Sequence, residues 1–152
     1  MLDDLQRLLT FNAWANRRAL ETLSSLGDPP AQTVRLLAHL VEAERVWIDR
    51  FDGVSADTAP WPDWTLAMIE TAITELEGRW TAFLRSTTEV DLRQPFEYQN
   101  TSGVPFRSEP ADVLLHVVLH AQEHRGQIGW LVGEAGGEWQ ETQYAWWRRD
   151  DG

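Results

Sequence analysis

The sequence predicts an all-α protein in which one domain, residues 1–152, forms a four-helix bundle. A length of 152 residues suits one domain with one core, and hydrophobic residues make up 43% of the chain. Four long segments repeat apolar residues at helical spacing. Breaks rich in proline, glycine and aspartate separate these segments. Four helices of about 20 residues each are typical of a bundle.

The first two segments form the predicted N-terminal half of the bundle. The first helix should run from about Asp3 to Ser25, where the stretch GDPP interrupts it. The second should run from about Ala31 to Phe51. Their apolar faces hold Leu5, Leu8, Leu9, Leu20 and Leu23 in the first helix, and Leu36, Leu40, Ala43, Trp47 and Phe51 in the second.

The third segment follows a loop, DGVSADTAPWPDW, whose Asp63 is expected to cap the next helix. That helix should run from about Trp64 to Arg85. Residues 91–107 mix aromatic residues with a Ser-Gly turn signal, which predicts an irregular hairpin-like crossover and not a helix. The third and fourth helices are therefore expected to be joined by a long connection.

The fourth helix is expected to begin after Ser108, its predicted cap, because proline and acidic residues fill the first turn. It should end near Gly133 or Gly136. The tail beyond it is rich in tryptophan. We expect this tail to add a short helix or a docked aromatic arm.

The net charge of −11, from 13 Lys+Arg and 24 Asp+Glu, argues against direct nucleic-acid binding, which needs a basic footprint. No run approaches the roughly 18 apolar residues of a membrane span. The first residues, MLDDLQRLLT, hold acids where a signal peptide holds bases. With 0 Cys there is no disulfide framework and no thiolate nucleophile or ligand. We expect a cytoplasmic protein without a membrane partner.

The stretch HVVLHAQEHRGQ, residues 116–127, places three of the 4 histidines in one row on the fourth helix. Successive positions four apart differ by about 40° on a helix, so His116, His120 and His124 share a face. His120 and His124 continue the apolar stripe of the helix. A lone buried histidine is more often a core residue held by hydrogen bonds. Two neighbouring imidazoles in an apolar interior leave donors and acceptors to satisfy, and a metal ion resolves that conflict.

His39 is the remaining histidine and lies at the border of the apolar stripe of the second helix. Alone it would more often be a satisfied core residue. With His120 and His124 it completes a three-histidine set of the kind that bundle cores assemble from facing helices. Three neutral imidazoles leave an ion one or more positions for water, which is typical of a catalytic metal site. No residue is assigned a catalytic role.

Two further residues of the row have open roles. His116 is expected outside the coordination sphere, as an ordinary packed residue or a partner of a ligand. Gln127 follows His124 by one turn and is expected to contact a ligand, a substrate or another bundle side chain. Neither a zincin motif nor a carboxylate-bridged di-iron set fits, because Ala121 follows His120 and no pair of ExxH motifs is present.

Two segments, HLVEAERVWIDRFDG at residues 39–53 and LLHVVLHAQEHRGQIGWLVGEAGG from residue 114, resemble the DinB/YfiT-like family of small metal-binding bundles. The opening FNAWANRRALETL is similar to the first helix of that family. The resemblance implies an up-down-down-up four-helix bundle that commonly forms a homodimer. It also implies Ni²⁺ or Zn²⁺ as the ion, with His39, His120 and His124 as ligands.

The same resemblance leaves the reaction open. Some members act as thiol-dependent transferases or isomerases, and others are named for induction by DNA damage without an assigned reaction. Our first hypothesis is a metal-dependent enzyme that transfers a low-molecular-weight thiol cosubstrate to a small electrophile, with a hydrolase as a variant at the same site. The alternative is a non-catalytic metal-binding stress-response protein.

Overall fold

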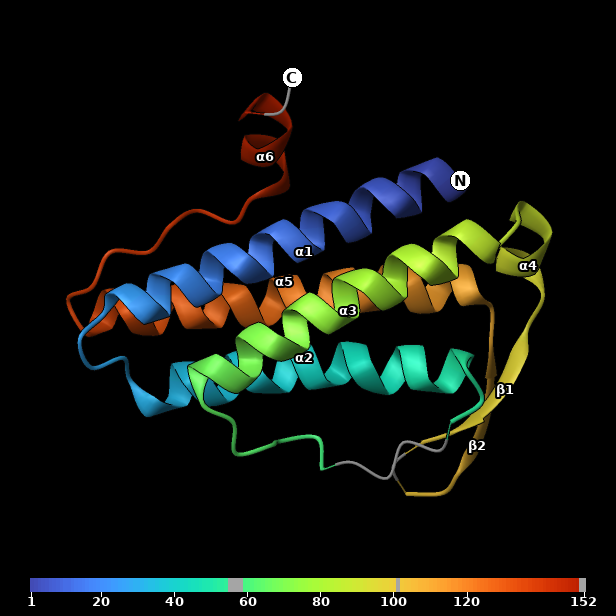
Figure 1. The fold of residues 1–152 in the computed structure, drawn as a ribbon, viewed down its shortest axis with the longest axis horizontal. Coiled ribbons are helices and arrows are strands. Elements are labelled where there is room, and N and C mark those ends of the chain that lie inside the picture. Colours follow the sequence, from blue (N-terminus) through green and yellow to red (C-terminus); the bar gives the residue numbers. More distant parts are fainter. Residues whose placement is uncertain (55–58, 101, 151–152) are drawn as a thin grey trace.

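Four long helices form a bundle in the computed structural model, which describes residues 1–54, 59–100 and 102–150. These helices are α1 (Leu2–Ser25), α2 (Ala31–Phe51), α3 (Leu66–Ser86) and α5 (Pro110–Glu134). In Figure 1, α1 and α3 form the nearer layer, and α2 and α5 lie behind them. α1 and α5 run in one direction and α2 and α3 in the other, which is the up-down-down-up arrangement. The prediction of an all-α fold is confirmed.

The core lies between the two layers, and every long helix contributes one apolar face to it. The predicted stripes account for most of these faces, although their outer members Leu8, Trp47 and Phe51 are only half buried. Side chains with at most 1% exposure come from each long helix: Leu23, Leu40, Ile69 and Ile128. Burial of such side chains contributes about 1.5–3 kcal/mol each and holds the histidine-bearing helices together.

The boundaries of α1 and α2 agree with the prediction to within one residue, but the start of α3 does not. The helix begins at Leu66, and its N-cap is Thr65, whose hydroxyl accepts a hydrogen bond from the Met68 amide at 3.3 Å. The expectation that Asp63 is the cap is wrong. Residues 55–58 of the loop before α3 lie outside the described part of the chain.

The connection between α3 and α5 holds a short helix, α4 (Glu89–Arg93), followed by strands β1 (Phe96–Gln99) and β2 (Pro105–Ser108). The strands pair in antiparallel register, with Phe96 opposite Ser108. The predicted hairpin is present, but the expectation that residues 91–93 avoid a helix is wrong. α4 forms because Thr88 and Asp91 make a reciprocal capping box at its N-terminus.

The N-terminus of α5 also differs from the prediction. Ser108 ends β2, and the N-cap of α5 is Glu109, which makes no side-chain capping hydrogen bond. Pro110 lacks an N–H group, so the first turn has one donor fewer to satisfy. The helix ends at Glu134, and Gly136 follows with a φ of +77° that favours glycine.

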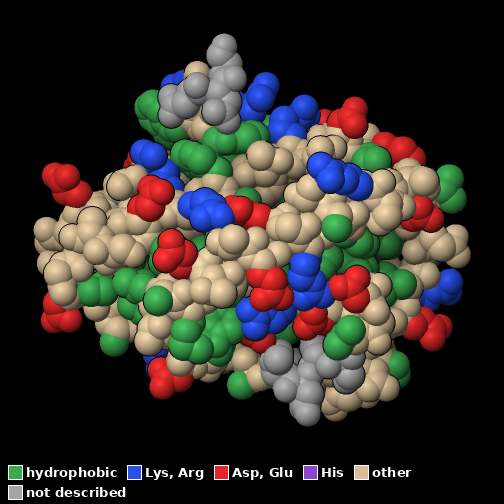
Figure 2. Space-filling model, in the orientation of Figure 1, with side chains coloured by type: hydrophobic (Ala, Val, Ile, Leu, Met, Phe, Trp, Pro, Cys, Tyr) green, Lys and Arg blue, Asp and Glu red, His purple; other side chains and the backbone are tan. Residues whose placement is uncertain are grey.

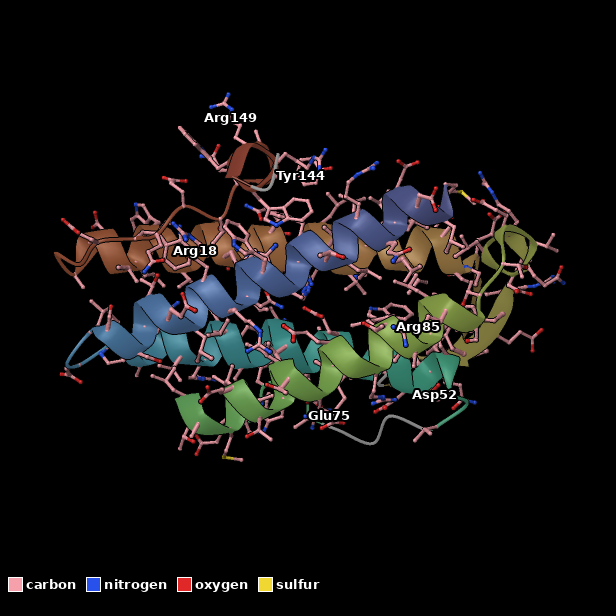
Figure 3. The ribbon with its side chains drawn as sticks, turned by 45° about the horizontal axis from the view of Figure 1, so that its top comes forward. Arg18, Asp52, Glu75, Arg85, Tyr144 and Arg149 are labelled. Carbon is pink, nitrogen blue, oxygen red and sulfur yellow. The ribbon has the colours of Figure 1, made fainter. Side chains whose placement is uncertain are left out.

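The C-terminal tail is both a short helix and a docked aromatic arm. α6 (Tyr144–Asp150) lies over α1, and Figure 3 shows Tyr144 on the side of α6 that faces the bundle. The rings of Tyr144 and Trp147 lie 5.3 Å and 5.8 Å from the ring of Phe11. Trp147 is buried by this contact.

The surface carries acidic and basic side chains interspersed on the face shown in Figure 2. None of the helices in the described residues combines the length and the apolar character that a membrane span requires. The homodimer that the family resemblance implies needs exposed apolar surface, but no Trp or Leu of α1 or α3 is exposed in the described part of the chain. The exposed large apolar side chains of the long helices are mostly on α5: Leu115, Leu119 and Trp130.

Candidate metal centre

Three histidines meet where α2 packs against α5. His39 lies on α2, and His120 and His124 lie one turn apart on α5. Each offers one ring nitrogen, and these three atoms all lie within 4.8 Å of one another. The three side chains are half buried, so they stand at the edge of the core and not inside it as the stripe had suggested. No histidine is visible on the face of α1 and α3 drawn in Figure 2.

In two of these rings, a hydrogen bond determines which nitrogen is free to bind a metal ion. His124 Nδ1 lies 2.8 Å from the side-chain oxygen of Gln127, and His39 Nδ1 lies 2.5 Å from the main-chain oxygen of Pro60. Because oxygen acceptors face both Nδ1 atoms, these atoms carry the proton and donate it. The lone pair of each ring is then on Nε2. Such partners fix the tautomer and the ring orientation of histidine ligands.

The spacing of the free nitrogens fits a shared ion. His120 Nε2 lies 3.1 Å from His124 Nε2. Two nitrogens that each bind one ion at about 2.0–2.1 Å, at octahedral or tetrahedral angles, lie about 2.8–3.4 Å apart. The His39 nitrogen completes the group within the same 4.8 Å limit. The residues present therefore suit a divalent ion, which the helical positions alone had suggested.

The electrostatics of the cluster keep the imidazoles of His120 and His39 neutral. The pKa of His120 is lowered to about 4, mainly by burial and in smaller steps by the neighbouring His124, His39 and His116. Burial also lowers the pKa of His39. The hydrogen bond to Pro60 raises this pKa in part, and the neighbouring His124 lowers it a little more. A neutral imidazole is the form that binds metal, so neither group has to release a proton at neutral pH.

The crossover from α2 to α3 covers one side of the cluster. Trp61 stacks on His39 with ring centroids 3.8 Å apart and an interplanar angle of 9°. Further along, Trp64 lies under the guanidinium of Arg45 at 4.9 Å, which holds the crossover on α2. No role was expected for Pro60 or Trp61 from the sequence. Their signal was the composition APWPDW, which is unusually aromatic for a solvated loop.

The other predicted residues take different places. His116 is exposed, its ring centroid lies 5.6 Å from that of His120, and it contacts Trp47 edge-on at 5.8 Å. It does not belong to the three-histidine group found among the described residues. Gln127 contacts His124, which is one of the roles expected for it. Glu123 is exposed.

Comparisons with known proteins find similarity along almost the whole chain. The sequence model of the DinB family matches residues 1–151. The chain is 27% identical over 166 aligned positions to "Protein DinB" of Bacillus subtilis (strain 168), which covers 95% of this chain and 93% of that protein. It is 28% identical over 91 positions to "Putative metal-dependent hydrolase YfiT" of the same organism, which covers 57% of this chain and 47% of that protein. The YfiT alignment thus spans about half of that relative.

Proposed function

This chain belongs to the DinB family, and we propose that it binds one divalent metal ion through His39, His120 and His124 and acts on a small-molecule substrate. The observation that carries the proposal is the convergence of three ring nitrogens within 4.8 Å of one another. Two of the rings are already held with Nδ1 turned to an oxygen. The proposed ion is Ni²⁺ or Zn²⁺, because both accept neutral imidazole nitrogen.

The ligand set supports an enzyme more than a structural staple. Structural zinc sites usually have four protein ligands, whereas catalytic sites keep a position for water or substrate. Among the described residues, the group contains three histidines and no carboxylate. Half-burial leaves the cluster within reach of small molecules from solvent. A non-catalytic metal-binding stress protein is the alternative, and a fourth ligand completing the shell would support it.

The reaction we propose is transfer of a low-molecular-weight thiol to a small electrophile. A divalent ion bound here would lower the pKa of a thiol or of water. Because the chain has 0 Cys, the sulfur nucleophile must come from a cosubstrate. An ionised thiol needs no separate general base, and no carboxylate belongs to the histidine group in the described residues. The name of the YfiT relative supports metal-dependent hydrolysis as the second candidate.

Metal analysis followed by paired assays tests the proposal. Protein loaded with Ni²⁺ or with Zn²⁺ should conjugate a small thiol to an aromatic halide, and chelator should abolish the activity. The same preparations should be offered an activated ester to measure hydrolysis. Glu75→Gln, an exposed substitution on α3, serves as the control and should retain activity that His120→Ala loses. Metal binding without either reaction would support the non-catalytic alternative.

We also propose that the protein works in the cytoplasm. We further propose that it forms the homodimer that the family resemblance implies. The exposed Leu119 and Trp130 of α5 supply apolar surface for such a contact. Light scattering over a wide concentration range tests the assembly. A constant mass of 17.4 kDa, that of one chain, would contradict the dimer.

A further inference from the structure

A cavity lies between α1 and α3, in the layer of the bundle opposite the histidine cluster. Its volume is about 530 Å³, within the range of small-molecule sites. Most of its wall is apolar and comes from Leu9, Trp14, Ile73, Leu76, Trp80 and Leu84. None of the three histidines of the proposed metal centre lines it. We call it the α1–α3 cavity.

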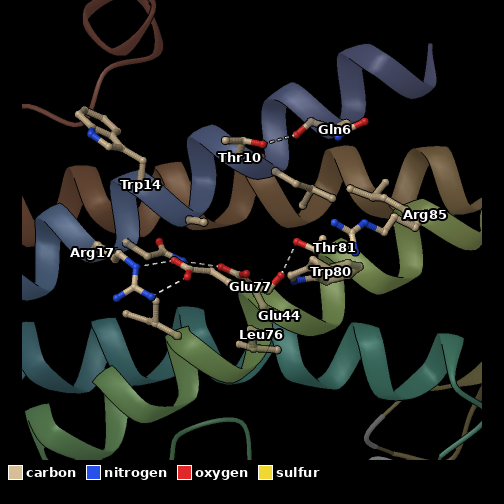
Figure 4. Close-up of a pocket in the computed structure, with 15 residues that line it drawn as sticks. Gln6, Thr10, Trp14, Arg17, Glu44, Leu76, Glu77, Trp80, Thr81 and Arg85 are labelled. Carbon is tan, nitrogen blue, oxygen red and sulfur yellow. Dashed lines mark hydrogen bonds and ion pairs between the residues drawn. The ribbon is translucent and has the colours of Figure 1, made fainter. Parts of the chain in front are cut away.

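A buried carboxyl group lines this cavity. Glu44 is 4% exposed, and its Oε1 accepts hydrogen bonds from the side-chain amides of Asn12 and Asn16 at 2.8 Å and 2.7 Å. No hydrogen bond to its Oε2 is found among the described residues. The buried Trp80 indole N–H lies beside the carboxyl group and favours its ionised form, although no hydrogen bond of normal geometry joins the two. Figure 4 shows Glu44 between Arg17 on one side and Trp80 on the other.

The positive charges around Glu44 leave its carboxylate only partly compensated. Arg125 does not bind it directly, because its Nη1 donates to the oxygens of Asn12 and Asn16, at 2.8 Å and 2.5 Å, and these amides separate the two charges. Arg17 is neutralised by two hydrogen bonds to Glu77, at 2.5 Å and 2.6 Å. The remaining lining arginine, Arg85, is exposed.

The chemistry of the cavity is that of an amine site. A carboxylate with an uncommitted oxygen attracts an ammonium group through a charge-assisted hydrogen bond. The apolar part of the wall, which includes Trp80, suits a short hydrocarbon chain. Burial raises the pKa of Glu44 despite the opposing effects of Asn16, Asn12, Arg125 and Trp80, so a nearby cation would stabilise its ionised form. The net charge of −11 also attracts cations.

We propose that the α1–α3 cavity binds a small protonated amine that carries a short apolar chain, with Glu44 as the residue that recognises its ammonium group. This site is separate from the metal centre. It lies in the opposite layer of the bundle and does not require an ion at the histidines.

Calorimetric titration of the full chain with n-hexylammonium chloride tests this proposal. The neutral 1-hexanol and the anionic hexanoate have the same chain and serve as matched probes. We expect both to bind at least about tenfold more weakly than the amine, because neither carries the positive charge that forms an ion pair with the carboxylate. Equal binding of hexylammonium and hexanol, or no detectable hexylammonium binding at millimolar concentration, would overturn the proposal.

Four variants locate the site. Glu44→Gln keeps an oxygen for Asn12 and Asn16 but removes the charge, and it should lower amine affinity at least about tenfold. Ala13→Phe fills the cavity without touching Glu44 and should also abolish binding, which keeps the test valid if Glu44→Gln unfolds. Glu75→Gln on the surface of α3 and His120→Ala at the metal centre should bind the amine like the native chain. Full amine affinity in a folded Ala13→Phe variant would refute the assignment.

Discussion

The Nε2 atoms of His120 and His124 lie 3.1 Å apart, one helical turn from each other on α5. At this distance the two rings can share one proton between them, or both can direct a lone pair to one ion. The hydrogen bond from His124 Nδ1 to Gln127 favours the second arrangement, because it fixes the lone pair of His124 on Nε2. The first prediction follows from this pair.

His120→Ala should abolish tight metal binding, because it leaves His124 and His39 on separate helices. The apo-protein should lose little stability, since His120 is only half buried. Metal stabilises the native chain by RT ln(1 + [L]/Kd), about 2.7 kcal/mol at a hundredfold excess over Kd. Thermal melting with metal and with chelator measures both effects. Equal lowering of the two melting temperatures would identify His120 as an ordinary core residue.

Trp61→Ala should weaken metal affinity by about tenfold, the lower end of the effect of removing a group that orients a ligand. The stacked indole restricts rotation of His39, and the substitution frees that ring. Trp61 is 47% exposed, so the apo-protein should keep its stability. Competition with a chromogenic chelator measures the affinity. Trp64→Ala, in the same crossover but on Arg45, is the control, and an equal loss in both variants would argue against a specific role for Trp61.

The apo-protein should lose stability between about pH 6.5 and pH 4 in part because of His120. The pKa of this group is about 4 in the folded chain, against 6.5 for a free histidine. The unfolded chain therefore takes up a proton in this window before the folded chain does, which favours unfolding. The contribution is constant above pH 6.5 and below pH 4. Urea unfolding in chelator should show a shallower decline for His120→Ala, and parallel curves would contradict the prediction.

Arg125→Met should destabilise the protein by about 3–5 kcal/mol, because it leaves the buried oxygens of Asn12 and Asn16 without their donor and removes a positive charge that favours ionised Glu44. Arg125 is 0% exposed and also donates to Gln122 at 3.0 Å. Adding Glu44→Gln should recover part of this loss by removing the uncompensated charge. Equilibrium unfolding in urea measures both variants. If the double variant were less stable than Arg125→Met alone, the charge argument would be wrong.

The helices could be predicted because their apolar residues repeat locally, and the same periodicity placed His120 and His124 on one face. The position of these two histidines at the edge of the core could not be predicted, because it depends on how far α2 and α5 overlap. The Pro60 and Trp61 contacts were also beyond the sequence, since the path of the crossover is set by packing between distant segments. Thr65 and Asp63 are both suitable caps two residues apart, and local pattern does not choose between them.

Arg125 shows a further limit of sequence reasoning. A charged residue within HRGQ is expected at the surface, yet it is buried because Asn12 and Asn16 from α1 supply acceptors for it. These partners lie more than a hundred residues away in the chain. Only the packing of α1 against α5 brings them together.

The order of the three histidines along the chain determines when the centre can form during synthesis. His39 is made early, and its two partners follow only after more than half of the chain has been added. A nascent chain that stops before α5 has one donor, and one imidazole holds an ion weakly. The three donors first meet when α5, the last long helix, packs against α1 and α2. Tight metal uptake would therefore require that α5 has been synthesised and has docked onto α2.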